Sequence, residues 1–193
     1  MKTLKFIHIT KTAGTSIENI AYQNGIHWGR FHNEYGLWHE PFIAKHKWLK
    51  DKYDWFTVVR NPYTRIVSEF YCEFGGPKNK DVTNEEFNKI IQNYILIRND
   101  ANKPYGQYHY IEQSKYIDKC YNIRILKYED LPNNFNSLMR EYSLDIILDY
   151  THDNKGIQKI FDVSDLNDNS IHLINSIYSD DFMNFNYPLR NIL

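Results

Sequence analysis

Apolar residues along this chain gather in short runs that are separated by polar and turn-forming residues. Three of these runs are rich in β-branched or aromatic residues, which is typical of buried strands: residues 4–9, 55–59 and 123–128. Each run leads into a loop and then into a segment with helical spacing. This alternation predicts an α/β fold, a P-loop-like arrangement of three layers in which helices flank a central, mostly parallel sheet.

Helical spacing of apolar residues predicts helices over about residues 15–23, 41–52, 84–96, 133–143 and 169–185, and a further helix that begins at Pro62. Asn61 is a good N-cap for this further helix, and residues 83–86 fit a capping box. One side of the helix after Asn61 carries Ile66, Val67, Phe70 and Phe74, and the opposite side carries Asn61, Arg65, Ser68 and Cys72. We expect the apolar side to face the core and the polar side to face solvent or a cleft.

Length and charge limit what the chain can be. Its 193 residues suit a single domain that spans residues 1–193, and the net charge of −1 gives no global field for nucleic acid. Two cysteines, Cys72 and Cys120, are too few for a disulfide framework. We expect no signal peptide, because residues 1–5 lead directly into the first predicted strand, and no apolar run approaches the ~18 residues that a membrane span needs. We therefore expect a soluble, cytoplasmic protein with reduced thiols, no membrane partner and an undetermined oligomeric state.

The loop "TKTAGTS" between the first predicted strand and helix combines several anion-binding features. Backbone N–H groups of residues 13–16 would point outward at a helix N-terminus, where the helix dipole favours negative charge. Lys11 adds a positive charge, Gly14 allows close backbone approach, and hydroxyl donors come from Thr12, Thr15 and Ser16. The alternative is an ordinary strand-to-helix turn with threonine or serine as the N-cap.

A nucleoside-triphosphate P-loop would require lysine directly after the last glycine and a hydroxyl for Mg²⁺. Here Thr15 follows Gly14, and Lys11 comes three residues earlier. No acidic residue is obviously placed at a strand end to hold Mg²⁺. The loop therefore suits a phosphate-bearing ligand whose chemistry does not depend on a metal.

The segment "VVRNPYTRIVSEF" offers a second set of phosphate ligands. Arg60 comes at the end of a predicted strand, where a guanidinium can form paired hydrogen bonds with a phosphate. Ser68 lies about two turns into the helix that follows. Taken separately, a surface salt bridge explains Arg60 and a solvated helix face explains Ser68. Taken together with the first loop, they favour phosphate binding.

These two segments resemble the donor-binding segments of the sulfotransferases. "HITKTAGTSI" resembles the loop that binds the 5′-phosphosulfate, and "VVRNPYTRIVSEF" resembles the segment that binds the 3′-phosphate. Supporting similarity comes from Gln113 with Tyr116, from "KYEDL" and from "YSDDFMNFNY". The similarity runs from about residue 5 to residue 188, and it is to the carbohydrate type, such as the heparan and chondroitin O-sulfotransferases.

The resemblance implies 3′-phosphoadenosine 5′-phosphosulfate (PAPS) as the donor, 3′-phosphoadenosine 5′-phosphate (PAP) as the product, and no metal. It implies that Lys11 faces the bridging oxygen of the leaving phosphate, where negative charge develops in the transition state. Residues 12–16, which include Thr12, Ala13, Gly14, Thr15 and Ser16, would hold the 5′-phosphate, and Arg60 and Ser68 would hold the 3′-phosphate. The acceptor would be a hydroxyl of a carbohydrate or small molecule.

A hydroxyl acceptor has a high pKa, so a general base near it assists the reaction. In the 2-O-type heparan enzymes a histidine about twenty residues before the arginine segment has this role, and His39 lies at that spacing. The neighbouring Glu40 is the type of base that other branches use. His32 and His46 are weaker candidates.

The chain departs from the family pattern at Ala13, which replaces a glycine; alanine still permits close approach unless its φ is positive. Two other functions remain open at this point. One is a P-loop-like nucleotide kinase or NTPase, which the missing glycine–lysine pair disfavours. The other is a non-catalytic module that binds the nucleotide without transferring a group.

Overall fold

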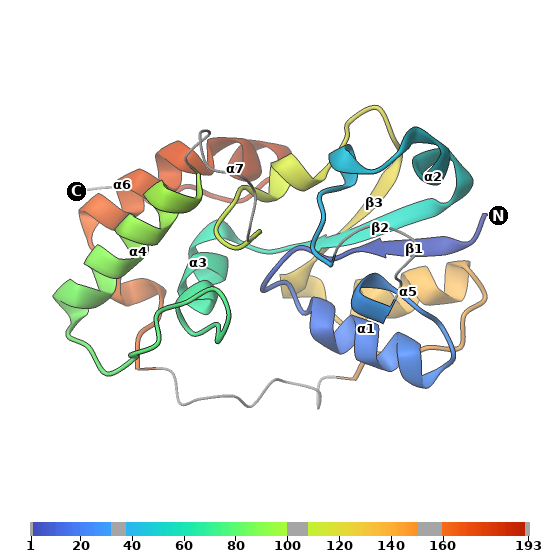
Figure 1. Ribbon diagram of the computed structural model, residues 1–193, viewed down its shortest axis with the longest axis horizontal. Coiled ribbons are helices and arrows are strands. Elements are labelled where there is room, and N and C mark those ends of the chain that lie inside the picture. The colour runs from blue at the N-terminus through green and yellow to red at the C-terminus, as the bar shows by residue number, and fades with distance from the viewer. Residues whose placement is uncertain (1, 32–37, 100–107, 150–159, 192–193) are drawn as a thin grey trace. The chain divides into compact units, whose positions relative to one another are not determined.

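The computed structural model describes residues 2–31, 38–99, 108–149 and 160–191, and these form two compact units (Figure 1). Unit 1 contains the described residues up to Arg60 together with residues 115–149. Unit 2 contains the described residues from Asn61 to Ser114 together with residues 160–191. Each unit has its own apolar core, and each is described by itself below. The expectation of a single domain stays a prediction.

Unit 1 is built on a parallel sheet of three strands in the order β1-β2-β3: β1 (Leu4–Ile7), β2 (Asp54–Val59) and β3 (Ile123–Lys127). Leu4 pairs with Asp54 at one end of the β1–β2 register, and Val59 pairs with Lys127 at the end of the β2–β3 register. Because the strands are parallel, their carboxyl ends lie at the same edge of the sheet, which is the edge that binds ligands in α/β proteins.

Helices cover both faces of this sheet. On one face, α1 (Gly14–Gln23) and α5 (Asn133–Glu141) pack onto the strands through a core that includes Ile17, Phe56 and Phe135. On the other face, the Trp55 ring contacts the Phe42 ring edge-on, and its indole N–H donates to the Lys50 carbonyl in α2 (Lys47–Lys52). Figure 1 shows α1 and α5 on one side of the strands and α2 on the other. The predicted α/β fold with a parallel, helix-flanked sheet is therefore confirmed.

Unit 2 is helical. It contains α3 (Pro62–Phe70), α4 (Asn84–Arg98), α6 (Asp168–Ile177) and α7 (Ser179–Phe185), and its core joins all four helices. Asn61 caps α3 by accepting a hydrogen bond from the Tyr63 N–H, with Pro62 in the first turn. Thr83 and Glu86 form the predicted capping box of α4. Local sequence signals therefore set these two helix starts correctly.

Short 3₁₀ turns connect the larger elements, at Gly29–Phe31, Phe42–Ala44, Gln113–Tyr116, Tyr128–Asp130 and Val163–Asp165. Two predicted helices are wrong in detail at such connections. The helix predicted over 41–52 is a 3₁₀ turn and the separate helix α2, because Lys45 and His46 are extended between them. The helix predicted over 169–185 divides into α6 and α7 at Tyr178, whose buried hydroxyl donates to the Tyr110 carbonyl.

The predicted faces of α3 also need correction. Arg65 is only 1% exposed, Ser68 and Cys72 are buried, and Phe74 is 74% exposed. Residues from outside the helix cover its polar side, and Arg65 donates to the Ile111 carbonyl at 2.8 Å while pairing with Glu69. Phe74 lies beyond the helix end at Phe70, so helical spacing does not apply to it.

Candidate functional site

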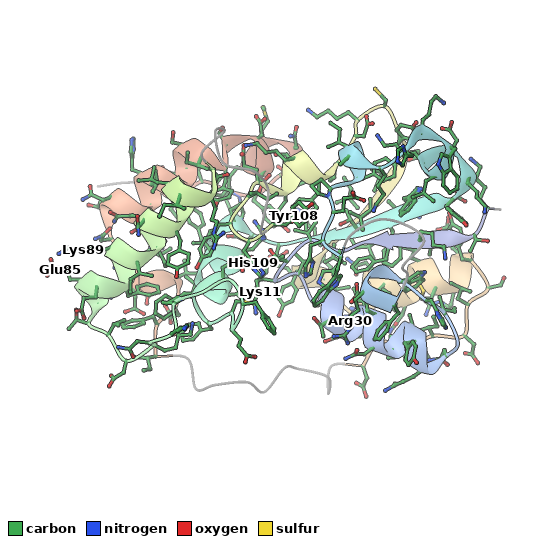
Figure 2. All side chains as sticks on the ribbon, viewed as in Figure 1. Lys11, Arg30, Glu85, Lys89, Tyr108 and His109 are labelled. Atoms are coloured by element: carbon green, nitrogen blue, oxygen red, sulfur yellow. The ribbon has the colours of Figure 1, made fainter. Side chains whose placement is uncertain are left out.

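The loop between β1 and α1 has an unusual backbone. Lys11 has a φ of 62° and Ala13 has a φ of 67°, both in the left-handed region that residues other than glycine rarely adopt. Such residues cost on the order of 1–3 kcal/mol each and are concentrated at functional sites. The substitution of alanine for the family's glycine at position 13 therefore falls on a position with positive φ. Lys11 lies on this loop in Figure 2.

The start of α1 carries no side-chain cap among the described residues. Its N-cap is Ala13, and the first intrahelical bond runs from the Ile17 N–H to the Ala13 carbonyl. The alternative of a turn capped by threonine or serine is therefore not what the structure shows. The Thr12 side chain is fully buried, and its hydroxyl donates to the Ile9 carbonyl at 2.8 Å, while Thr15 and Ser16 are partly exposed. Amides at an uncapped helix N-terminus suit an anion.

The His8 ring leaves no room for a side chain at residue 14, so this position requires glycine. A Cβ atom at this position would lie 2.1 Å from Cδ2 and 2.2 Å from Nε2 of His8. The His8 ring is therefore packed directly against the first turn of α1. Its other nitrogen, Nδ1, lies 2.8 Å from Oε1 of Glu18 and 3.0 Å from the Trp38 indole nitrogen.

Three nitrogen atoms lie within hydrogen-bond distance of Oε1 of the fully buried Glu18. Besides the His8 ring, the Trp38 indole donates at 3.2 Å and the Arg30 backbone N–H donates at 3.3 Å. The Arg30 guanidinium lies 3.7 Å from the other oxygen, Oε2. A Cβ atom at residue 29 would meet the Glu18 side chain, so Gly29 leaves room for the carboxylate. A buried carboxylate with this many donors holds the loop and the neighbouring residues in one arrangement.

The structure brings His39 to the same loop. Its Nδ1 lies 3.2 Å from the backbone carbonyl of His8, and since a carbonyl only accepts, Nδ1 is the protonated nitrogen. In a neutral ring with this tautomer, the lone pair lies on the other nitrogen, Nε2. The His39 ring also lies stacked on the Trp38 ring, with 4.1 Å between the ring centres, and edge-on to the His8 ring at 4.2 Å.

The other candidate bases are arranged differently. The Glu40 carboxylate accepts a hydrogen bond from the Lys45 ammonium at 3.0 Å. Burial lowers the pKa of Lys45 below its usual range, and the adjacent Glu40 carboxylate opposes this shift. His46 is exposed and precedes the first turn of α2. His32 lies outside the described residues.

Arg60 joins the carboxyl ends of all three strands. It follows β2, its Nη1 donates to the Lys11 carbonyl at 3.2 Å, and its guanidinium lies over the Tyr128 ring at 4.1 Å from the ring centre. Tyr128 comes directly after β3. Arg60 and His39 thus both contact the backbone of the loop of unit 1 that carries Lys11. Ser68 belongs to α3 in unit 2, where it is 7% exposed.

Comparison with known proteins shows the family to which this chain belongs. The model of the sulfotransferase family matches residues 2–188, nearly the whole chain. The chain belongs to the sulfotransferase family. Searches of curated proteins and of solved structures return no match. Membership of this family indicates a transferase that moves a sulfuryl group to a hydroxyl-bearing acceptor. Within the described residues, none of the helices has the length and apolar character of a membrane span.

Sequence reasoning did not find the residues that support the site of this sulfotransferase. The pattern does not point to His8, Glu18, Trp38 or Arg30, because a histidine in a predicted strand and a glutamate in a predicted helix are each ordinary. One signal was available. His8 interrupts the apolar run 4–9 immediately before the loop, and a polar residue inside a buried strand requires a partner.

Proposed function

We propose that this member of the sulfotransferase family transfers the sulfuryl group of PAPS to a hydroxyl of a carbohydrate. The observation that carries the proposal is that Arg60 and His39 both contact the backbone of the loop between β1 and α1, which carries Lys11. This loop lies at the edge of the sheet where α/β proteins bind their ligands. No metal is part of the proposed reaction.

The donor would be held from two directions. Amides at the uncapped N-terminus of α1, with Gly14 at the first helical position and the hydroxyls of Thr15 and Ser16 nearby, suit the 5′-phosphate. Arg60, with Ser68 as its predicted partner, would bind the 3′-phosphate that distinguishes PAPS from ATP. In the structure, the Arg60 guanidinium already lies beside the loop.

His39 is the proposed general base. Its Nδ1–H is held by the His8 carbonyl, so Nε2 can take the proton of the acceptor hydroxyl. As that oxygen bonds to sulfur, the bond between sulfur and the bridging oxygen breaks, and the electron pair stays on the phosphate. Lys11 would stabilise the charge that develops on that bridging oxygen. The pairing of Glu40 with Lys45 supports His39 over Glu40 for this role.

A carbohydrate acceptor is supported by the aromatic surface beside His39. Trp38 is stacked on the His39 ring and is 39% exposed, so its indole offers an apolar surface for the C–H face of a sugar ring. The nearby lysines give less support for an acidic glycan, because Lys45, Lys47 and Lys50 are each paired with a carboxylate.

The first experiment compares the melting temperature of the chain with PAP, with AMP and with ATP plus Mg²⁺. A site that selects the 3′-phosphate should respond to PAP far more than to AMP or ATP. At one hundred times the dissociation constant, a ligand stabilises the folded state by about 2.7 kcal/mol. Equal shifts from all three ligands would contradict a PAPS site, and a shift with ATP that depends on Mg²⁺ would favour a kinase or NTPase.

The second experiment measures transfer of labelled sulfate from PAPS across a panel of glycans and small alcohols. Transfer to a glycan supports the proposal, and transfer only to small alcohols corrects the acceptor class. PAP binding without transfer to any member of the panel would instead favour a module that binds the nucleotide without catalysis.

A further inference from the structure

Unit 2 contains a group of three metal-ligating side chains that the proposed reaction does not use. The ligand atoms of Glu69, Cys72 and His109 all lie within 4.8 Å of one another. Glu69 is fully buried, Cys72 is 8% exposed, and the His109 side chain is 12% exposed. We infer that these three residues form a binding site for a single Zn²⁺ ion.

The chain places the three ligands by local structure. Glu69 lies in the last turn of α3, and the Cys72 N–H donates to the Glu69 carbonyl at 2.9 Å, which continues the turn. Side chains three residues apart on a helical turn share one side, so the carboxylate and the thiol face the same way. His109, which is labelled in Figure 2, comes from a segment forty residues away and completes the group.

The imidazole lies in a space that the sequence keeps open. A Cβ atom at residue 75 would lie 2.4 Å from Nδ1 and 2.5 Å from Cγ of His109, so any residue larger than glycine would push the ring away. Gly75 follows three residues after Cys72 in the chain. The glycine therefore lets the imidazole approach both the thiol and the carboxylate.

The two oxygens of Glu69 have separate neighbours. Oε1 lies 3.6 Å from Nη2 of Arg65, and Oε2 lies 2.7 Å from Nδ1 of His109. Arg65 is itself fixed by donating to the Ile111 carbonyl. The guanidinium therefore holds one oxygen and leaves the other directed at the ligand group, which is how a neighbouring charge orients a carboxylate ligand.

The chemistry of the three ligands suits Zn²⁺, and small shifts would bring their atoms to the spacing that zinc requires. Zinc bonds of about 2.3 Å to sulfur and about 2.0–2.2 Å to nitrogen and oxygen put tetrahedral ligand atoms about 3.4–3.6 Å apart. The observed separations, 2.7 Å for one pair and at most 4.8 Å for the others, need shifts of roughly 1 Å to reach that geometry. Thiolate and imidazole ligands select zinc over Mg²⁺ and Ca²⁺, which prefer oxygen. Three protein ligands leave the fourth position to water.

The test uses the full chain, treated with a chelator and then titrated with Co²⁺ as a spectroscopic probe. We expect one Co²⁺ per chain and a near-ultraviolet charge-transfer band from thiolate to cobalt, which Zn²⁺ then displaces. Cys72→Ser should abolish the band, while Cys120→Ser should keep it, because Cys120 is an exposed thiol of unit 1. Absence of stoichiometric binding, or a band that depends on Cys120 rather than Cys72, would overturn the assignment.

Two further variants keep the thiol in place. His109→Gln should weaken Co²⁺ binding at least about 100-fold, since even residues that only orient ligands change affinity 10–100-fold. Gly75→Ala should also weaken binding, although it leaves all three ligands present. Circular dichroism checks that each variant is folded, and unchanged Co²⁺ affinity in both folded variants would count against the site. This result is independent of whether the chain binds PAP.

Discussion

Replacing Gly14 by alanine should destabilise unit 1, because the new methyl group would occupy the position of the His8 ring. The Cβ atom would lie 2.1 Å from one ring atom and 2.2 Å from another. The ring is 5% exposed and is held at Nδ1 by Glu18, so it cannot move without breaking a buried hydrogen bond. The His8 backbone also holds His39, so the same substitution disturbs the proposed base.

The expected cost follows from these contacts. Overpacking a tight site costs about 1–3 kcal/mol, and leaving a buried carboxylate without one of its donors costs about 1–3 kcal/mol more. Gly14→Ala should therefore lower the free energy of unfolding by at least about 2 kcal/mol. For a chain of this size that corresponds to a drop in melting temperature of at least about 4 °C.

The assay is urea unfolding monitored by tryptophan fluorescence. This signal reports on unit 1, because all four tryptophans, at positions 28, 38, 48 and 55, belong to it. His8→Ala should remove the clash, so adding Gly14→Ala to that variant should change stability by less than about 1 kcal/mol. The interaction energy of the double-mutant cycle should be about 2 kcal/mol, well above the usual additivity error of about 0.3–0.5 kcal/mol. Additive effects of the two substitutions would refute the idea that the ring requires glycine.

Three other predictions concern catalysis and stability. Lys11→Ala should lower kcat by about 10²–10³-fold with little change in PAP affinity, because its charge is matched to the transition state; unchanged transfer would mean that Lys11 has another role. His39→Asn should lower kcat by about 10²–10⁴-fold, because it removes the proposed general base. Glu40→Gln should leave kcat within the same order of magnitude. A larger loss of kcat in Glu40→Gln than in His39→Asn would assign the role of base to Glu40. Thr83→Ala should cost about 1 kcal/mol in urea unfolding by loss of a helix cap. Hydrogen bonds from Thr83 lower the pKa of Glu86, so the contribution of Glu86 is present above the ordinary glutamate range and is lost as pH falls through the lowered pKa. The stability difference between the wild type and Thr83→Ala should accordingly shrink in acid, and a difference that grows would contradict this origin.

The sequence predicted the strands and helix starts well, because their signals are local. Residues 55–59 form an apolar run that is buried on both faces of the sheet, and the actual strand differs by only one residue. The capping residues Asn61 and Thr83 act within three residues of themselves, so their roles can be read without knowledge of the fold. The features for which we propose anion binding by the β1–α1 loop also lie within seven consecutive residues, and their role stays a prediction.

The sequence failed where distant segments decide the outcome. Arg65 is buried because residues 109–111 cover the polar side of α3, and periodicity along one helix carries no information about such a cover. The Glu69, Cys72 and His109 group has the same origin, since two ligands come from one turn and the third from forty residues away. His8 and Glu18 likewise form a pair only after α1 folds back onto the sheet.

The contacts of Arg60 have a consequence for the entropy of ligand binding. A loop that a ligand must first order loses conformational freedom on binding, and this loss reduces the affinity. Here the Lys11 carbonyl already accepts a hydrogen bond from Arg60, whose guanidinium lies over the Tyr128 ring. These two contacts connect the loop to the ends of the second and third strands. Part of the ordering of this loop is thus completed when the protein folds, and the free energy of its interactions with an anion can appear more fully as affinity.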